Sequence, residues 1–322
     1  MSVNINDILF ISGMYKSGTS WLLRILGEHP NVRGFNEINL IKGIWYSKFG
    51  ITIPKSTLHR AESLLGSPSY SRIDKTFIKE LVKSRDIELF LSKISKASDD
   101  RKVLKNFIDL PKIKQRKICE LLLFQRDNKE FLKEFLDTHK EDGKLTIFKS
   151  ADIMHQFKPI EHALGSRRQI VVVRDGRDVS VSAVHFLILM KRKVASWYLT
   201  MFYSMYVLKF RVWNKRVTKL IELMNENHDM LVIRYEDLLL NFEDTISKVF
   251  DYCNLPYSDD LIKELKNKTS FKKLSGREPG HEQKNIMRKG VMGDWKNKLT
   301  RREIKACDRI GERTLRYFDY FE

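Results

Sequence analysis

The sequence has few cysteines and no long apolar segment. Its 322 residues include only Cys119, Cys253 and Cys307, whose spacing fits neither a metal site nor a disulfide framework. No apolar run approaches the roughly 20 residues that span a bilayer, and the first residues lack the basic start and cleavage site of a signal peptide. Internal repeats and low-complexity linkers are also missing. We therefore expect a cytoplasmic protein without a membrane span, long enough to bury a substantial core.

The complete phosphate-binding motif of nucleoside triphosphatases is missing too. That motif, G-x-x-x-x-G-K-[ST], places its lysine after the second glycine, whereas here Lys16 precedes Gly18. No clear metal-binding aspartate follows a strand, and no metal site is expected. These absences disfavour a small-molecule kinase, which stays as one alternative function.

Positive charge is abundant. The chain has 59 basic and 41 acidic residues, a formal net charge of +18. Such a surface favours anionic partners such as nucleotide phosphates, although lysine-rich surfaces also follow from the base composition of a genome. A non-catalytic binder of nucleic acid or another polyanion is a second alternative, but we expect no nucleic-acid partner.

A buried strand, a turn and a helix open the sequence. Ile8–Ile11 is an apolar run typical of a strand, and Ser12-Gly13 begins the turn. A helix with an apolar face then starts within Lys16–Ser20. Unpaired backbone N–H groups and the helix dipole at such a start favour a bound phosphate. We call residues 12–18 the first loop. An ordinary strand-to-helix turn is the alternative interpretation.

Three further buried strands are expected, at 145–148, 169–173 and 230–233, with helical segments between them. This alternation predicts a parallel sheet with helices on both faces. Ligands of such sheets bind beyond the carboxyl ends of the strands. Lys16, Lys149, Arg174 and Tyr235 each follow a predicted strand, so we expect them to converge on one edge.

Two regions between the strands are predicted to be helical. Residues 38–143 contain several amphipathic segments and no clear strand, which indicates a helical insertion on the acceptor side of one domain spanning 1–322. Within it, 101–117 holds seven basic residues against Asp109 alone, either a solvated face or an anion-binding rim. The segment Met190–Leu220 is predicted to be one long helix with an aromatic stripe that packs in the core. Lining of an apolar acceptor pocket is the alternative for a few N-terminal members of the stripe.

Two later segments add cations next to glycines or hydroxyls. Arg174–Ser182 follows a strand and places an arginine and a serine where they suit a second phosphate, although Arg and Asp after a strand often form a structural ion pair. Arg288–Asn297, which we call the closing loop, has two adjacent cations, two glycines and Asp-Trp. It lies in 263–302, which carries thirteen basic and four acidic residues.

These segments together resemble the cofactor signature of the sulfotransferases that use 3′-phosphoadenosine 5′-phosphosulfate (PAPS). Lys16–Trp21 is similar to the family's 5′-phosphosulfate loop, Arg174–Ser182 to its 3′-phosphate motif, and the closing loop to RKGxxGDWKN nearly residue for residue. Thr269–Phe271 resembles a segment that reaches the adenine. The segments follow the family's order along almost the whole chain.

The resemblance implies an α/β, P-loop-NTPase-like fold of three layers, with a central parallel sheet between helices. It implies that PAPS donates a sulfuryl group, by in-line displacement, to a hydroxyl or amine of a small metabolite or natural product, leaving adenosine 3′,5′-bisphosphate (PAP). Lys16 and Lys149 would act on the transferred group. The implied cofactor-binding residues are Lys16, Ser17, Gly18, Thr19 and Ser20 for the 5′ end, Trp21, Tyr235 and Phe271 for the adenine, and Arg174, Ser182, Arg288, Lys289 and Gly290 for the 3′-phosphate.

The general base is the point at which the sequence departs from one branch of the family. Members acting on phenols and steroids have Lys-[Thr/Ser]-His after a strand, but Ala151 stands at that histidine position. Glu37 lies where the bacterial-type glutamate lies, and we favour it as the base. Asp152 and His155 are the alternatives, and an ion pair is the structural alternative for Glu37.

The short dimer motif Lys-x-x-x-Thr-Val-x-x-x-Glu is also incomplete. Lys296 and Thr300 are present, whereas Arg301 and Lys305 replace the valine and the glutamate. A monomer is therefore favoured over a dimer.

Overall fold

The computed structural model describes residues 8–36, 88, 111–124, 134–149, 168–189, 204–226, 228–281 and 288–321. Its strands are β1 (Ile8–Gly13), β2 (Val32–Asn36), β3 (Leu145–Lys149), β4 (Gln169–Val173) and β5 (Met230–Arg234). They are hydrogen-bonded in the order β2-β3-β1-β4-β5. The four predicted strands are confirmed, three of them extended by one or two residues, and the sheet also includes β2.

The chain divides into two compact units whose boundaries cut through the strands. One comprises 1–11 and 29–169, and the other comprises 12–28 and 170–322. In the first unit, β3 pairs in parallel with both β1 and β2. Phe148 of β3 stacks on Phe35 at 5.5 Å between ring centroids and lies 6.0 Å from Phe10. Burial lowers the pKa of neighbouring His139 to about 4, so this histidine is a neutral part of the aromatic core.

The predicted helical region 38–143 lies mostly outside the described residues. Its main described element is α7 (Lys112–Phe124). Arg116 there pairs with Glu88 at 3.0 Å and Lys117 with Glu134 at 3.4 Å, and both cations are more than half exposed. The described end of the basic run is therefore a solvated helix face.

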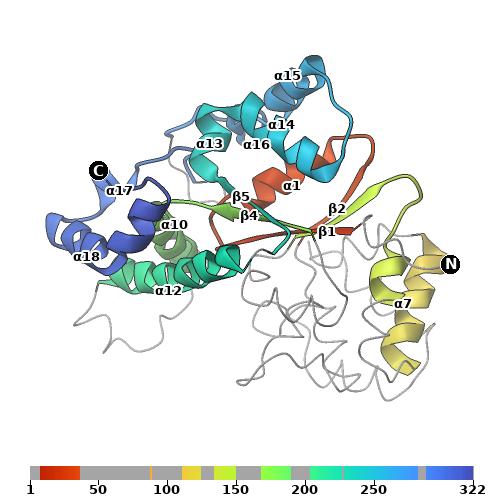
Figure 1. Ribbon diagram of the computed structural model, residues 1–322, viewed down its shortest axis with the longest axis horizontal. Helices are drawn as coiled ribbons and strands as arrows, with labels where there is room; N and C mark the ends of the chain where they lie inside the picture. Colours follow the sequence, from red (N-terminus) through yellow and green to blue (C-terminus); the bar gives the residue numbers. More distant parts are fainter. Residues whose placement is uncertain are drawn as a thin grey trace. The chain divides into compact units, whose positions relative to one another are not determined.

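The second unit places helices on both sides of its strands, as Figure 1 shows. One group consists of α10 (Gly176–Leu189), α12 (Met205–Asn225), α17 (Trp295–Lys298) and α18 (Arg301–Tyr317), which contact one another. The other consists of α13 (Tyr235–Leu240), α14 (Phe242–Cys253), α15 (Asp259–Lys268) and α16 (Phe271–Ser275), with α1 (Thr19–Gly27) beside them. This arrangement agrees with the predicted layers.

The prediction of one helix from Met190 to Leu220 is wrong. Ser204 has extended backbone torsions (φ −57°, ψ 133°), and its side chain accepts a hydrogen bond from the amide of Tyr206. It therefore caps a new helix, α12, which starts at Met205 and continues to Asn225. The expected stripe packs in the core within this shorter helix, where Phe210, Trp213 and Val217 are buried. Its members before Ser204 lie outside the described residues.

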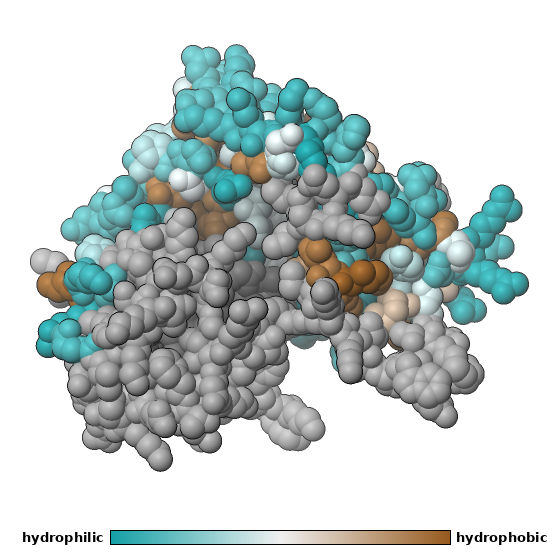
Figure 2. All heavy atoms as spheres, turned by 180° about the vertical axis from the view of Figure 1, so that it is seen from behind, coloured by the Kyte–Doolittle hydropathy of each residue, from teal (hydrophilic) through white to brown (hydrophobic). Residues whose placement is uncertain are grey.

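The C-terminal helix α18 begins with a capping box. The Thr300 hydroxyl accepts from the amide of Glu303, and the Glu303 carboxylate accepts from the amide of Thr300 at 2.7 Å. Thr300, which the sequence placed in a dimer motif, thus has a local role in starting this helix. None of the described helices is both long enough and apolar enough to cross a bilayer. One face of the described part is largely hydrophilic (Figure 2), as the charge of the chain predicts.

Candidate active site

The first loop is shaped by backbone conformation. Gly13 and Gly18 have φ of 150° and 99°, and Lys16 has φ of 74°, which is uncommon for a residue with a side chain. A Cβ on Gly13 would lie 2.4 Å from the carbonyl oxygen of Val172, and one on Gly18 would lie 2.5 Å from the Tyr235 ring. These close approaches explain why the loop contains glycine at both positions. The side chain of Ser17 is buried and donates to the carbonyl of Met14 at 2.5 Å, closing the turn.

The start of α1 has no side-chain cap and no acidic residue in its first turn. By contrast, hydroxyls of Ser204, Ser258, Ser270 and Thr300 cap α12, α15, α16 and α18. The first N–H groups of a helix have no partner within the helix. The cap position of α1 is Gly18, which has no side chain, and the hydroxyl of the preceding Ser17 donates to Met14. The N-terminus of α1 therefore keeps the donor groups and the partial positive charge that bind an anion.

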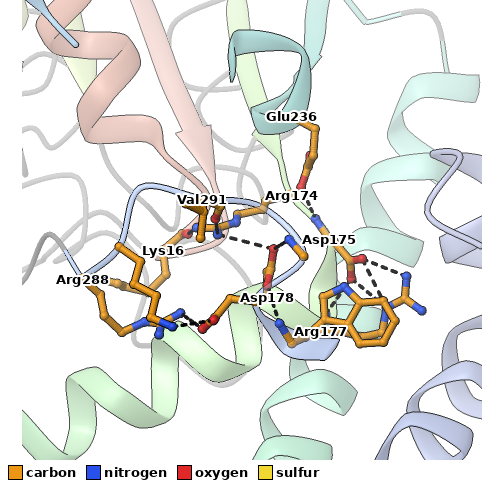
Figure 3. A network of polar contacts seen from close by, with 12 residues as sticks. Lys16, Arg174, Asp175, Arg177, Asp178, Glu236, Arg288 and Val291 are labelled. Carbon is orange, nitrogen blue, oxygen red and sulfur yellow. Dashed lines mark hydrogen bonds and ion pairs between the residues drawn. The ribbon is translucent and has the colours of Figure 1, made fainter. Parts of the chain in front are cut away.

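Arg174 lies at the centre of the site, between the first loop and the closing loop (Figure 3). Its guanidinium donates to the carbonyl of Lys16 at 3.4 Å and to the carbonyl of Val291 at 2.9 Å. It also lies over the ring of Tyr235, 4.3 Å from the centroid. Burial opposes its charge, but the surrounding acidic groups, which include Asp178, Glu236 and Asp175, outweigh burial and raise the pKa of Arg174. One buried cation thus contacts both loops.

The closing loop carries its own counter-charge. Asp294 accepts from Lys289 at 2.7 Å and pairs with Arg288 at 2.5 Å. Burial opposes ionisation of this carboxyl, but the hydrogen bonds and charges of Lys289 and Arg288 outweigh it and lower the pKa of Asp294. The two cations that the sequence assigned to a phosphate are therefore held together by one carboxylate.

A second carboxylate joins the closing loop to α10. The backbone amides of Gly293 and Trp295 donate to the two oxygens of Asp178 at 2.7 and 3.0 Å. Arg174 lies 3.5 Å from the same carboxylate. Asp178 is 1% exposed, so these contacts are shielded from water.

Beside Asp178, another buried ionic cluster fixes the start of α10. Arg177 donates to Asp175 at 2.8 Å and to Asp308 of α18 at 3.1 Å, and its guanidinium lies 3.8 Å from the centre of the Trp295 ring. The amide of Asp175 donates to Glu236, whose other oxygen accepts from the Tyr320 hydroxyl. Burial raises the pKa of both Asp175 and Glu236. This cluster ties the segment between β4 and α10 to α13, to α18 and to the residues after α18.

Aromatic rings line the part of the site between the two loops. Trp21 of α1 meets Tyr235 edge-on at 5.7 Å between ring centroids, and its indole N–H donates to the carbonyl of Thr269 at 2.8 Å. Phe271 follows two residues later, and a Cβ on Gly290 would lie 2.2 Å from its ring. Gly290 therefore lets the backbone of the closing loop lie directly against an aromatic face.

All the predicted cofactor-binding residues belong to the second unit, in segments joined by the contacts above. Ser17, Thr19 and Ser182 are buried, whereas Ser20 is exposed. Lys149 belongs to the other unit, where it is buried at the end of β3 in register with Ile11. Glu37, Asp152 and His155 lie outside the described residues.

The sequence patterns indicate an aspartate after this strand only as part of a structural ion pair, and Asp178 does lie 3.5 Å from Arg174. The patterns predict neither the contact of Asp178 with the closing loop nor a role for Asp294 or Glu236. A signal was present for Asp294, which follows the cationic pair by five residues in the same loop, and none for Glu236.

The comparisons with known proteins agree with this geometry. The model of the family described as "Sulfotransferase domain" matches residues 6–319. Sulfotransferase 1B1 of Mus musculus is 25% identical over 163 residues, 46% of this chain and 54% of that protein. Sulfotransferase 6B1 of Danio rerio is 25% identical over 101 residues, 30% of this chain and 31% of that protein. The chain thus spans about a third to a half of the length of these curated relatives.

Solved structures share the fold. The crystal structure of mouse sulfotransferase SULT7A1 complexed with PAP has a TM-score of 0.53 and 15% identity, and the alignment covers 98% of this chain and 85% of that one.

Proposed function

The chain belongs to the sulfotransferase domain family, and from that premise we propose that it transfers a sulfuryl group from PAPS to a small-molecule acceptor. The observation that carries the proposal is the position of Arg174, whose guanidinium contacts the backbone of both the first loop and the closing loop. PAPS has two separated anionic ends and one aromatic base. The described site offers a matching group for each part: the uncapped start of α1 and the cations Arg288 and Lys289 for the two anionic ends, and the rings of Trp21 and Tyr235 for the base.

The residues present fit this donor. Nε of Arg174 is buried and has no hydrogen-bond partner among the described residues, and an anionic oxygen would satisfy it. Gly18 and Gly290 pack their backbone directly against the rings of Tyr235 and Phe271, which an added Cβ would approach to 2.5 and 2.2 Å, so both rings are held next to the two loops. SULT7A1, which shares the fold, was crystallised with PAP.

We assign the residues as the family resemblance implies. Lys16, the backbone of 17–20 and the hydroxyls of Thr19 and Ser20 would hold the 5′-phosphosulfate. Arg174, Ser182 and the pair Arg288–Lys289 would hold the 3′-phosphate. Trp21, Tyr235 and Phe271 would contact the adenine. Burial raises the pKa of Tyr235, so this side chain is a neutral phenol there. The bound donor supplies the phosphosulfate linkage, which is the source of the sulfuryl group.

Lys16 and Lys149 would stabilise the negative charge that develops as the linkage breaks. Such charge stabilisation lowers the barrier only where it is stronger in the transition state than in the ground state. Glu37 is the proposed general base that takes the acceptor proton, with Asp152 and His155 as alternatives. A monomer and a cytoplasmic location remain predictions.

The experiment has two steps. Calorimetry with PAP tests donor binding directly. Incubation with labelled PAPS and a panel of hydroxyl- and amine-bearing metabolites then tests transfer. Glu37→Gln, Asp152→Asn and His155→Ala are compared in the transfer step, and the variant that loses turnover while it keeps PAP binding identifies the base. No binding of PAP by the unmodified protein would overturn the proposal.

A further inference from the structure

We propose that Asp178 is a positioning residue that sets the selectivity of the site for a ligand bearing a second phosphate. The inference rests on the proposed function and adds a role for a carboxylate that does not itself bind the anion. Asp178 would act through the backbone of the closing loop on Arg288 and Lys289.

The geometry of Asp178 is the first argument. A carboxylate in the first turn of a helix ordinarily lies near the amides of its own helix. Asp178 instead accepts the amides of Gly293 and Trp295 at 2.7 and 3.0 Å, one on each oxygen. Burying an ionised carboxylate is costly unless such donors compensate it. The contact therefore specifies the position of the closing loop relative to α10.

The second argument concerns Asp294, the residue between the two amides that Asp178 accepts. Asp294 is flanked by Gly293 and Trp295, so Asp178 fixes the backbone on both sides of it. The carboxylate of Asp294 in turn holds Arg288 and Lys289, at 2.5 and 2.7 Å. A continuous chain of contacts thus runs from α10 through Asp178 and Asp294 to both cations, and Figure 3 shows Arg288 at one end and Asp178 within this network.

Two roles of Asp178, as a negative charge near the anion or as a residue that positions the closing loop, predict opposite changes in anion binding when Asp178 is neutralised. If Asp178 acted only as a nearby negative charge, Asp178→Asn would strengthen the binding of an anion. If it positions the loop, the same substitution weakens binding, because the asparagine amide places a donor against one of the two backbone N–H groups. The sign of the change therefore separates the two roles.

The test compares two nucleotides by calorimetry: PAP, and adenosine 5′-monophosphate, which lacks the 3′-phosphate. We expect Asp178→Asn to weaken PAP binding by roughly ten- to a hundredfold, since a hydrogen bond to a charged group is lost. Binding of the monophosphate should change less than about twofold. Equal losses for both ligands, or tighter PAP binding, would overturn the inference.

A second pair of variants keeps the test valid if Asp178→Asn folds poorly. Gly293 and Gly143 have nearly the same φ, 74° and 73°, and no atom lies within 4 Å of an added Cβ at either. Both alanine variants therefore introduce similar backbone strain, but only Gly293 donates to Asp178. Gly293→Ala should weaken PAP binding selectively while Gly143→Ala leaves it unchanged, and identical behaviour would contradict the role of Asp178.

Failure of the inference is distinguishable from failure of the proposed function. If the unmodified protein does not bind PAP, the proposed function is wrong. If it binds PAP more tightly than the monophosphate and the preference survives both Asp178→Asn and Gly293→Ala, only the positioning role is wrong.

Discussion

The first loop and the closing loop contact the same arginine but are built by different physics. The first loop is held by backbone torsions and close packing, with left-handed residues at Lys16 and Gly18 and a ring against the backbone. The closing loop is held by two carboxylates, Asp178 and Asp294. A loop made by sterics is insensitive to pH, whereas a loop made by ion pairs depends on the protonation of its acids. The two halves of the site should therefore respond differently to substitution and to pH.

The largest effect should come from the first loop's cation. Lys16→Met should lower turnover on the order of 10²–10³-fold, about 2.7–4 kcal/mol, by analogy with the loss of one donor to a developing anion. Steady-state kinetics with PAPS measure it, and Lys305→Met, at an exposed position on α18, is the matched control. Equal turnover of the two variants would show that Lys16 does not stabilise the transition state.

The second prediction concerns packing in the first loop. Gly18→Ala forces a Cβ to within 2.5 Å of the Tyr235 ring at φ 99°, whereas Gly143→Ala meets no atom within 4 Å at φ 73°. Both substitutions cost backbone strain, but only the first overpacks. We expect Gly18→Ala to lower the free energy of unfolding by about 1–3 kcal/mol more than Gly143→Ala. Urea denaturation measures the free energy of unfolding of both variants. Equal losses of stability would mean that the first loop shifts to make room for the added Cβ.

A smaller effect is expected where α1 meets the segment before α16. Trp21→Phe keeps the ring next to Tyr235 but removes the indole N–H that donates to Thr269 at 2.8 Å. The loss of one such hydrogen bond costs about 0.5–1.5 kcal/mol in the free energy of unfolding. Thermal denaturation detects it. A variant as stable as the unmodified protein would show that water replaces the indole donor.

The last prediction concerns how stability depends on pH, the property in which the two loops should differ most. The pKa of Asp294 lies below its ordinary value of 3.8. Its ion pairs therefore stabilise the folded state fully above 3.8, and this stabilisation is lost as the pH falls through the lowered pKa. The difference in free energy of unfolding between the unmodified protein and Asp294→Asn should be constant from neutral pH down to that region and then shrink.

Gly18→Ala provides the comparison for that titration. Because its cost arises from packing, its difference from the unmodified protein should not change over the same pH range. Parallel pH profiles for Gly18→Ala and Asp294→Asn would contradict the distinction between the two loops.

Local patterns were sufficient to predict much of the fold. The apolar runs that became β1, β3, β4 and β5 are short, continuous and followed by a polar turn, so their strand character is a local property. The predicted helix from Met190 to Leu220 failed for a local reason as well. The periodic apolar stripe continues on both sides of Ser204 and so predicts an unbroken helix. The serine caps a helix only because its ψ of 133° is extended, which the apolar pattern does not reveal.

The cations, glycines and hydroxyls of the site and their order could be predicted from the sequence alone, because each lies within a few residues of a strand end or a helix start. The contacts that join these segments depend on how the chain packs in three dimensions. Asp178 meets Gly293 across 115 residues and Glu236 meets Asp175 across 61. Such pairings leave no periodic pattern in the sequence. A carboxylate needs hydrogen-bond donors to offset the cost of desolvation only when it is buried, and it becomes buried only when distant segments pack together.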